Sequence, residues 1–308
     1  MTSISPELEE FLQVVRRVAA ASGGSGDGLA SEQSSLRNTG LLDLGRDTAD
    51  EPDALYWLAH TVRTAAELDP SLAFVLASRY VADRTFGGEA VDPAFALAVS
   101  CSRPVVATAF APDRIVILDV EKAALRAVPW AALSPDEEER TGLRRASLVS
   151  ISMPDSAVTL TGSVTDAAYH WDLLTSAALA GIARRALAET QSYVLERHQF
   201  GVPIGSFAGL RAMVADMDLT VSGVEAALDC ALLNDGAINN LAATAGRAAV
   251  DVCVDAIQAH GGYGYIDEYP LAGLLRDAMG IQARAGGRRL HAARVAERGL
   301  GPRKGRSS

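Results

Sequence analysis

Long stretches of helical periodicity, separated only by short turns, dominate the second half of the chain. Apolar residues recur every three or four positions from Asp172 onward, which predicts a succession of helices. The predicted helices run from Asp172 to the turn at Arg197–Gly201, from Phe207 to Leu233, from Ala237 to Ala259, from Leu271 to Ala285 and from Arg288 to Arg298. Long antiparallel helices joined by short turns pack as a bundle. Residues 166–301 are therefore predicted to form a C-terminal helical bundle.

Residues 1–95 predict a second, smaller helical domain. The predicted helices cover residues 4–21, 53–68 and 72–86. Ser5-Pro6 supplies a cap and first-turn pair for the first helix, and Asp69-Pro70-Ser71 opens the third. Gly87-Gly88 is expected to cap the end of the third helix, and the glycine- and serine-rich run at 22–26 predicts a flexible connection.

The pattern changes between residues 96 and 165. Short runs rich in β-branched residues, bounded by Pro, Gly or Asp, predict strands. These runs lie at Val105-Val106, Arg114–Leu118, Ala146–Val149 and Ala157–Leu160. Together they predict a small antiparallel β domain. The whole chain is thus predicted to be mainly α with a small β domain, and it ends in a basic tail at 302–308.

Composition narrows the classes of partner. A chain of 308 residues with 49% hydrophobic content can bury a sizeable core. The formal net charge of −10 argues against nucleic acid, because phosphates would be repelled in bulk. The basic run Arg303-Lys304-Gly305-Arg306 is a local exception, and it is most simply a solvated terminus.

Cysteine usage and the N-terminus bear on the compartment. Cys101, Cys230 and Cys253 are odd in number and widely spaced, which suits a reducing cytoplasm better than a disulfide framework. None of them forms a Cys-x-x-Cys pair, so no metal site is predicted. The first residues are acidic where a signal peptide would be basic, and no apolar run approaches the roughly 20 residues of a membrane helix. The expectation is a soluble cytoplasmic protein with no membrane contact.

Two turns of the predicted bundle carry residues that bind anions in many proteins. The first is Arg197–Gly201, and the second begins at Gln258 and contains Gly261-Gly262. Each has a structural explanation, because basic groups favour a helix C-terminus and glycines cap helices. Each also has a functional one: arginine can donate paired hydrogen bonds, and glycine lets a backbone approach a large anion.

The wider sequence around these turns closely resembles the flavin-dependent acyl-CoA dehydrogenase family. The turns are similar to its arginine-x-x-phenylalanine-glycine and glutamine-x-x-glycine-glycine signatures, and Glu268-Tyr269-Pro270 and Arg276-Asp277-Ala278 follow in family order. The resemblance is strong over 172–287, moderate over 36–88, where an abbreviated N-terminal domain is implied, and weak between.

In that family both turns bind FAD, usually the cofactor held mainly by the neighbouring subunit. The resemblance therefore implies a set of FAD-binding residues in this chain. Arg197 would hold the pyrophosphate and Phe200 would pack against the adenosine end. Ala208 stands where the family commonly has a glutamine beside the cofactor. The implied set is Arg197, Gln199, Phe200, Gln258, Gly261 and Gly262.

The same resemblance implies that the catalytic base is missing. Most family members place a glutamate at the position of Ala285, and a minority place it at Trp171; neither alanine nor indole accepts a proton. Asp172 is the nearest carboxylate, and it also reads as an N-cap for a helix beginning at Leu173. The family motifs that contact the flavin ring are not found in the β region. No catalytic residue is therefore assigned to this chain.

This combination resembles the short partner subunits of actinobacterial heteromeric acyl-CoA dehydrogenases. These assemble as α2β2 tetramers with a longer catalytic subunit, and their substrates are steroid-derived CoA thioesters. Two alternatives stay open. One is a self-sufficient flavoenzyme with Asp172 or Glu268 as a displaced base; the other is a scaffold or regulatory protein without flavin. His170, His198 and His260 form no recognisable metal or acid–base spacing, although His198 and His260 lie in the two turns.

Overall fold

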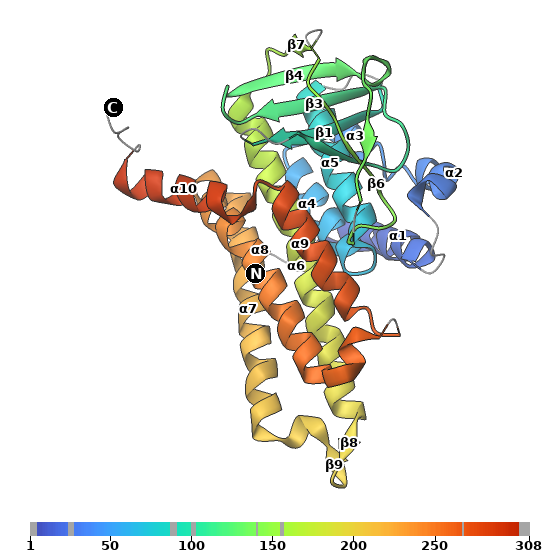
Figure 1. The fold of residues 1–308 in the computed structure, drawn as a ribbon, viewed down its shortest axis with the longest axis vertical. Coiled ribbons are helices and arrows are strands. Elements are labelled where there is room, and N and C mark those ends of the chain that lie inside the picture. Colours follow the sequence, from blue (N-terminus) through green and yellow to red (C-terminus); the bar gives the residue numbers. More distant parts are fainter. Residues whose placement is uncertain are drawn as a thin grey trace.

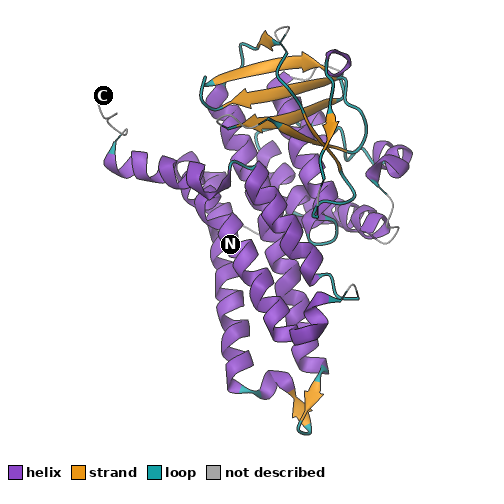
Figure 2. Ribbon diagram, viewed as in Figure 1, coloured by secondary structure: helices purple, strands orange, loops and turns teal. Residues whose placement is uncertain are grey.

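A sheet region lies at one end of a long helical bundle in the computed structural model (Figure 1). The structure describes residues 5–23, 28–86, 91–99, 103–139, 141–154, 157–266 and 268–301. The predicted Gly87-Gly88 cap, most of the 22–26 connection, Cys101 and the basic tail lie outside the described residues. The prediction of a mainly α chain with a small β region is confirmed (Figure 2).

The described residues of the N-terminal part form three long helices and two short ones. The helices are α1 (Pro6–Gly23), α2 (Gln33–Asn38), α3 (Leu44–Asp47), α4 (Ala54–Ala66) and α5 (Pro70–Phe86). Of the long helices α1, α4 and α5, α4 packs against the other two. The expected cap of α1 is present, because Ser5 Oγ accepts the Leu8 N–H at 3.2 Å. Asp69 caps α5 by accepting the Ser71 and Leu72 N–H groups at 3.0 and 3.1 Å. These caps fix where both helices begin.

Two sheets make up the β region. Their strands are β1 (Pro93–Ala98), β2 (Val105–Thr108), β3 (Arg114–Asp119), β4 (Ala124–Pro129), β5 (Asp136–Glu137), β6 (Ser147–Ser150) and β7 (Val158–Thr159). The strand orders are β1-β3-β4-β7 and β2-β6-β5. The four predicted runs coincide with β2, β3, β6 and β7, whereas β1, β4 and β5 are additional. The expectation of a purely antiparallel domain was wrong, since β1 pairs parallel with β3.

The reason lies in how β1 packs on α5. β1 alternates alanine with larger residues, and alanine is a weak strand signal in a sequence. Phe95 and Leu97 pack on the helix side of the strand, whereas Ala94 and Ala96 pack against residues of the other strands. The Phe95 N–H donates to Ser78 Oγ at 2.9 Å, and that hydroxyl donates to the Phe95 carbonyl at 3.0 Å. One edge of β1 is therefore satisfied by a helix, which leaves the other edge for β3.

The C-terminal bundle follows the predicted order of helices. Its elements are α6 (Val164–Glu196), the short strands β8 (His198–Gln199) and β9 (Val202–Pro203), α7 (Ala208–Leu233), α8 (Ile238–His260), α9 (Leu271–Arg284) and α10 (Gly287–Leu300). The start of α6 differs from the prediction: Ser163 caps it by accepting the Asp166 N–H at 3.1 Å. Asp172 is therefore no N-cap. It lies inside the helix and is buried.

α6 lies at the centre of the molecule and packs against α4, α5, α7, α8 and α9. Gly181 marks its closest approach to a neighbour. A side chain at this position would overlap the backbone carbonyl of Arg63 in α4. The absence of a Cβ thus allows the N-terminal domain to pack directly on the bundle.

Asp83, the one carboxylate of α5, is buried. It is 2% exposed, and neither oxygen has a hydrogen-bond partner among the described residues. Arg79 Nε lies 3.8 Å away, but Arg79 also pairs with Asp43 and Asp92. Burial raises the pKa of Asp83 to about 7, despite the nearby guanidinium groups.

Replacing Asp83 by asparagine should change how stability depends on pH. The pKa of Asp83 in the folded protein lies above its ordinary value of 3.8. The unfolding free energy of the wild type therefore decreases as pH rises towards 7. Between pH 5 and pH 8, the wild type should lose about 2–3 kcal/mol more unfolding free energy than Asp83→Asn. Urea unfolding at both pH values measures this. An equal loss in the two proteins would mean that Asp83 is already ionised at pH 5.

Candidate cofactor and reaction sites

The turn after α6 projects from the end of the bundle opposite the sheets (Figure 1). The Arg197 N–H donates to the Tyr193 carbonyl at 2.9 Å, and the Ile204 N–H donates back to the Arg197 carbonyl at 2.8 Å. Between them, β8 and β9 form a tight hairpin. Its two central residues, Phe200 and Gly201, have φ angles of 54° and 82°. The left-handed backbone suits glycine but is strained for phenylalanine.

Phe200 is strained and also unshielded. Its side chain is 93% exposed, and its ring meets only the edge of Phe207, at a centroid distance of 6.2 Å. An exposed aromatic ring at a projecting tip loses the hydrophobic stabilisation that burial would give. Leu195, Val202 and Phe207 are exposed near it, and apolar residues gathered in one exposed patch mark surfaces that another molecule covers.

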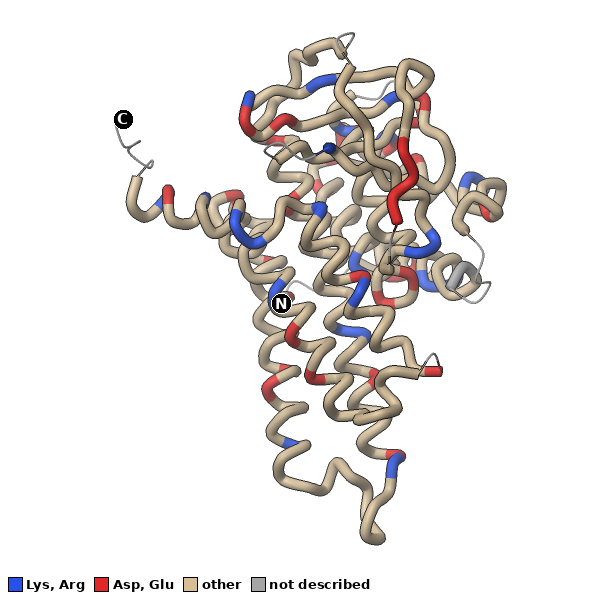
Figure 3. The backbone as a smooth tube through the Cα atoms, in the orientation of Figure 1, with Lys and Arg blue, Asp and Glu red and all other residues tan. Residues whose placement is uncertain are grey.

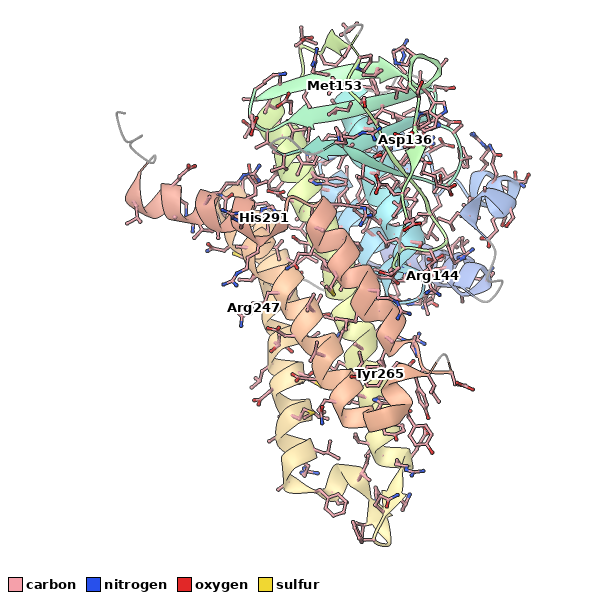
Figure 4. The ribbon with its side chains drawn as sticks, in the orientation of Figure 1. Asp136, Arg144, Met153, Arg247, Tyr265 and His291 are labelled. Carbon is pink, nitrogen blue, oxygen red and sulfur yellow. The ribbon has the colours of Figure 1, made fainter. Side chains whose placement is uncertain are left out.

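The turn after α8 lies beside the first. Gly261 has a φ of 60°, and no atom lies within 4 Å of where a side chain at Gly261 or Gly262 would begin. Gln258 is exposed at the end of α8. The Arg197 guanidinium lies 5.4 Å from the centre of the Tyr263 ring, which joins the two turns by a cation–π contact. Figure 4 shows the neighbouring Tyr265 towards this end of the bundle. The structure thus brings all six predicted cofactor residues to one end of the bundle.

An aromatic stack supports both turns from below. The His260 ring is buried and stacks on Tyr193 at 4.0 Å, while Tyr269 meets it edge-on at 5.1 Å. His260 Nδ1 lies 2.8 Å from the Ala256 carbonyl oxygen. A carbonyl can only accept a hydrogen bond, so Nδ1 carries the proton. Burial lowers the pKa of His260, which favours the neutral ring. Sequence reasoning missed this role of Tyr193, although its spacing of four residues from Arg197 places both on one helix face.

These residues fit the anionic and aromatic parts of FAD. No carboxylate pairs with Arg197 in the described part of the chain, so its donors are available for a pyrophosphate. The open glycine backbone allows close approach of an anion, and Phe200 offers an apolar face. Ala208, the first residue of α7, cannot supply the amide expected at that position. His198 Nδ1 lies 2.9 Å from the Glu196 carbonyl, which ties it to its own turn.

The second region lies roughly 40 Å from the first, because 26 residues of α6 separate Trp171 from Arg197. Trp171 is 2% exposed and fills the space between α5, α6 and β1. Its ring centre lies 5.0 Å from that of Phe95 and 5.6 Å from that of Phe74. The indole is therefore a core side chain, in a position where the resembled family can carry its base.

Ala285, the other implied base position, is buried at the junction of α9 and α10. Its carbonyl lies 2.9 Å from Nε2 of His291, which Figure 4 shows where α10 leaves the bundle. The cavity lined by Ala285, Thr175, Gln282 and neighbouring residues has a volume of about 10 Å³. That volume holds at most about one water molecule. The pocket around Ala285 is closed to a thioester.

Asp172 connects the two base positions. Its Oδ2 accepts from the Arg294 guanidinium at 2.7 Å and lies 3.9 Å from His291 Nδ1. Burial raises the pKa of Asp172 to about 7, although the charge of Arg294 acts in the opposite direction. The carboxylate is thus engaged by α10, and the cavity lined by Thr175, Ala285 and His291 is too small for a substrate. A charged pair of this kind anchors α10 to α6.

The remaining candidate groups lie apart from one another. Glu268 is exposed before α9, about 21 Å along that helix from Ala285. His170 is half-buried near Arg84, and burial lowers its pKa to about 4. Within the described ranges, no group of three or more His, Cys, Asp or Glu residues could hold a metal ion. No helix in those ranges is long and apolar enough to cross a membrane.

Comparison with protein families agrees with the bundle geometry. Residues 164–300 match the family model described as acyl-CoA dehydrogenase, C-terminal domain. A short-chain-specific acyl-CoA dehydrogenase of Clostridium acetobutylicum is 37% identical over 105 residues, which are 32% of this chain and 28% of the relative. An acyl-CoA dehydrogenase of Bacillus subtilis is 38% identical over 109 residues, 33% and 29% of the two chains. The chain thus spans less than a third of the length of these curated relatives.

Solved structures share the fold over nearly the whole chain. Butyryl-CoA dehydrogenase from Megasphaera elsdenii superposes with a TM-score of 0.74 at 18% identity, covering 95% of this chain and 97% of that one. A structure described as an FAD-dependent dehydrogenase gives a TM-score of 0.78 at 16% identity, covering 98% and 100%. At these identities the likeness shows the fold.

Placing a glutamate at position 285 should destabilise the protein without creating a reaction. A larger, charged side chain has no room in the 10 Å³ cavity, so Ala285→Glu should lower the unfolding free energy by about 2–4 kcal/mol. The small, polar control Ala285→Ser should stay within about 1 kcal/mol of wild type. Thermal unfolding and an acyl-CoA oxidation assay measure both effects. A stable glutamate variant that oxidises acyl-CoA would contradict the closed pocket.

Proposed function

We propose that this chain, whose residues 164–300 match the C-terminal domain of acyl-CoA dehydrogenases, is a non-catalytic subunit of a flavin-dependent enzyme. The enzyme would desaturate a CoA thioester between its α and β carbons. In the proposed complex the chain binds part of the FAD that a longer, catalytic subunit holds. The reacting groups belong to that partner.

One observation supports this assignment above all: the two regions of α6 have opposite character. The end at Arg197 is open, exposed and unneutralised. The end at Trp171 is filled by aromatic side chains and sealed by the contacts of Asp172. A subunit that completes a neighbour's cofactor site needs the first region and has no use for a cavity in the second.

The residues of the two turns have distinct tasks in this proposal. Arg197 donates hydrogen bonds to the FAD pyrophosphate, and Phe200 covers the adenosine end. Gly261 and Gly262 let the backbone approach the phosphates, and the amides of Gln199 and Gln258 supply further polar contacts. When bound in the partner, FAD supplies hydride acceptance from the substrate. This chain only positions the cofactor and excludes water from it.

The partner would provide what this chain lacks. It would carry the glutamate base, the strands that contact the flavin ring and the thioester pocket. An α2β2 assembly in the cytoplasm and a bulky, steroid-derived CoA substrate follow from the resemblance to heteromeric members. They form part of the proposal, together with the dependence of activity on the partner.

The alternative of a self-sufficient enzyme with a displaced base has less support. Asp172 is ion-paired to Arg294, and Glu268 lies at the far end of α9 from Ala285. Asp172→Asn and Glu268→Gln should therefore leave the turnover of the assembled complex within about twofold of wild type. Steady-state kinetics with the partner present tests this. A loss of 100-fold or more in either variant would identify a base in this chain.

Co-expression with candidate partners from the same genome neighbourhood tests the assignment directly. We expect the chain alone to purify without flavin and without acyl-CoA oxidation, and a yellow, active complex to form with one partner. Purified chain that retains stoichiometric FAD and turns over acyl-CoA would contradict the proposal. A colourless complex with every partner would favour the scaffold alternative.

Arg197→Ala should weaken FAD binding by the complex and leave its assembly intact. A buried, charge-assisted contact contributes about 1.5–3 kcal/mol, which is roughly a ten- to a hundredfold change in affinity. The control is Arg103→Ala, because Arg103 pairs with Asp136 on the surface of the β region. FAD titration into the apo-complexes measures the dissociation constants. Equal FAD dissociation constants for Arg197→Ala and wild type would mean that Arg197 acts only as a charge at the helix end and does not bind FAD.

A further inference from the structure

α7 is apolar on two opposite faces. At 100° per residue, its inward face carries residues buried against α6 and α8, and the opposite face points to solvent. The inward residues are Met217, Val221, Val224, Leu228 and Ala231. The outward residues are Ala208, Ala212, Ala215, Leu219, Ala226, Cys230 and Leu233. A helix at the surface of a lone subunit is normally polar on its outer side, whereas a helix that is apolar all round is normally covered.

The exposure on this outward face is substantial. Leu219 and Leu233 are 70% and 81% exposed. In the described ranges, every large apolar side chain that is exposed lies between Leu195 and Met279, except Val158 and Leu300. Scattered exposed leucines need no explanation, but their concentration on one bundle does. We call the outward residues of α7 named above the outer α7 face.

A groove extends the outer α7 face towards the cofactor turns. It lies between the last turns of α6 and the first half of α7 and has a volume of about 680 Å³. Val194, Leu195, Leu210 and Val214 give it apolar walls, and Ala212 and Ala215 belong to both groove and face. Leu195 lies two residues before Arg197. The apolar surface is therefore continuous with the region that meets FAD in the proposed function.

The rim of this surface is acidic. Asp216 borders the outer α7 face, and Asp251 and Asp255 lie on the adjacent α8; Figure 3 shows acidic residues along both helices. Burial raises the pKa of Asp255, and the charges of Asp251 and Asp216 raise it further. Arg247 pairs with Asp251 at 3.1 Å, and Figure 4 shows it on the outer side of the bundle. Arg211 and Asp218 line the groove itself, so two arginines stand against four aspartates and the surface is net negative.

The acidic rim discriminates between possible occupants. In a symmetric dimer the same patch faces itself, so Asp216 and Asp255 would meet like charges. The chain as a whole carries a net charge of −10, which adds to that repulsion. A partner with basic side chains around an apolar centre would instead neutralise the rim while covering the leucines.

We propose that the outer α7 face and its groove dock a heterologous partner chain that presents an apolar helical surface bordered by Lys or Arg. This inference rests on the proposed function, for which it names the surface where the catalytic subunit binds. The apolar centre would provide the burial, and the acidic rim would select the partner over a second copy of this chain.

Leu219→Arg tests the surface in the co-purified complex. A charged side chain in the apolar centre should weaken association with the partner by 100-fold or more, as measured by mass photometry over a dilution series. Leu219 is exposed, so the isolated variant should keep the wild-type melting temperature. The matched control is Val158→Arg, on β7 and 62% exposed, which should leave association unchanged. Asp216→Lys should weaken association mainly at low salt, because it removes attraction to the basic rim.

Cys230 provides a second readout on the same face. It is exposed, whereas Cys253 is buried, so alkylation in a Cys101→Ser background reports on Cys230 alone. Partner binding should slow its alkylation at least tenfold, and the Leu219→Arg chain should lose that protection. A flavin-loaded complex that survives Leu219→Arg with Cys230 reactive would refute this surface and leave the proposed function standing.

A different result would overturn both proposals. In that case the wild-type chain binds no partner at any concentration and self-associates through the outer α7 face, so that Cys230 is protected in the isolated chain. Leu219→Arg would then disperse the self-associated species. The occupant would be a second copy, and the subunit assignment would fail with the docking surface.

Discussion

Burial of α6 on every side is the constraint on which the rest of the structure depends. This 33-residue helix packs against α4, α5, α7, α8 and α9, and its exposed residues lie in its first turn and its last turns. Gly181 permits the backbone of α4 to approach it, which joins the N-terminal domain to the bundle. Because one rigid helix carries both Trp171 and Arg197, the filled region and the exposed turn keep a fixed separation.

The filled region shows how a reaction pocket can be replaced by packing. Trp171, Phe74 and Phe95 supply large apolar surfaces whose burial stabilises the junction of helices and sheet. Asp172 and Arg294 add an ion pair that fastens α10. Opening a pocket here would expose the aromatic surfaces and leave a buried charge unpaired, both of which cost free energy. The exposed tip has no comparable free-energy cost for binding, because Phe200 and Arg197 are exposed and would gain contacts with a bound molecule.

The periodic helices were predictable because long, regular patterns outweigh local irregularities. The ends of α7, α8 and α9 fall within about two residues of expectation. The start of α6 was not predicted correctly. Tyr169, His170 and Trp171 interrupt the aliphatic pattern, although the helix already begins before them, at the Ser163 cap. That error made Asp172 look like a cap. β1 was missed because alanine is a weak strand signal, and Ala94 and Ala96 are placed in a strand only by their packing against other strands, which is a tertiary contact.

For the candidate site, motif recognition located the two turns that the structure brings together. It could not reveal the stack of Tyr193, His260 and Tyr269 beneath them, which depends on how three helix ends meet. Nor could it show that the space around Ala285 is closed.

The central claim is that the chain contributes to a neighbour's FAD and holds none of its own. The flavin content of the complex with the catalytic partner tests it most directly. Flavin absorbance against quantified protein should give one FAD for each pair of unlike chains. Two FAD molecules for each pair would contradict the account.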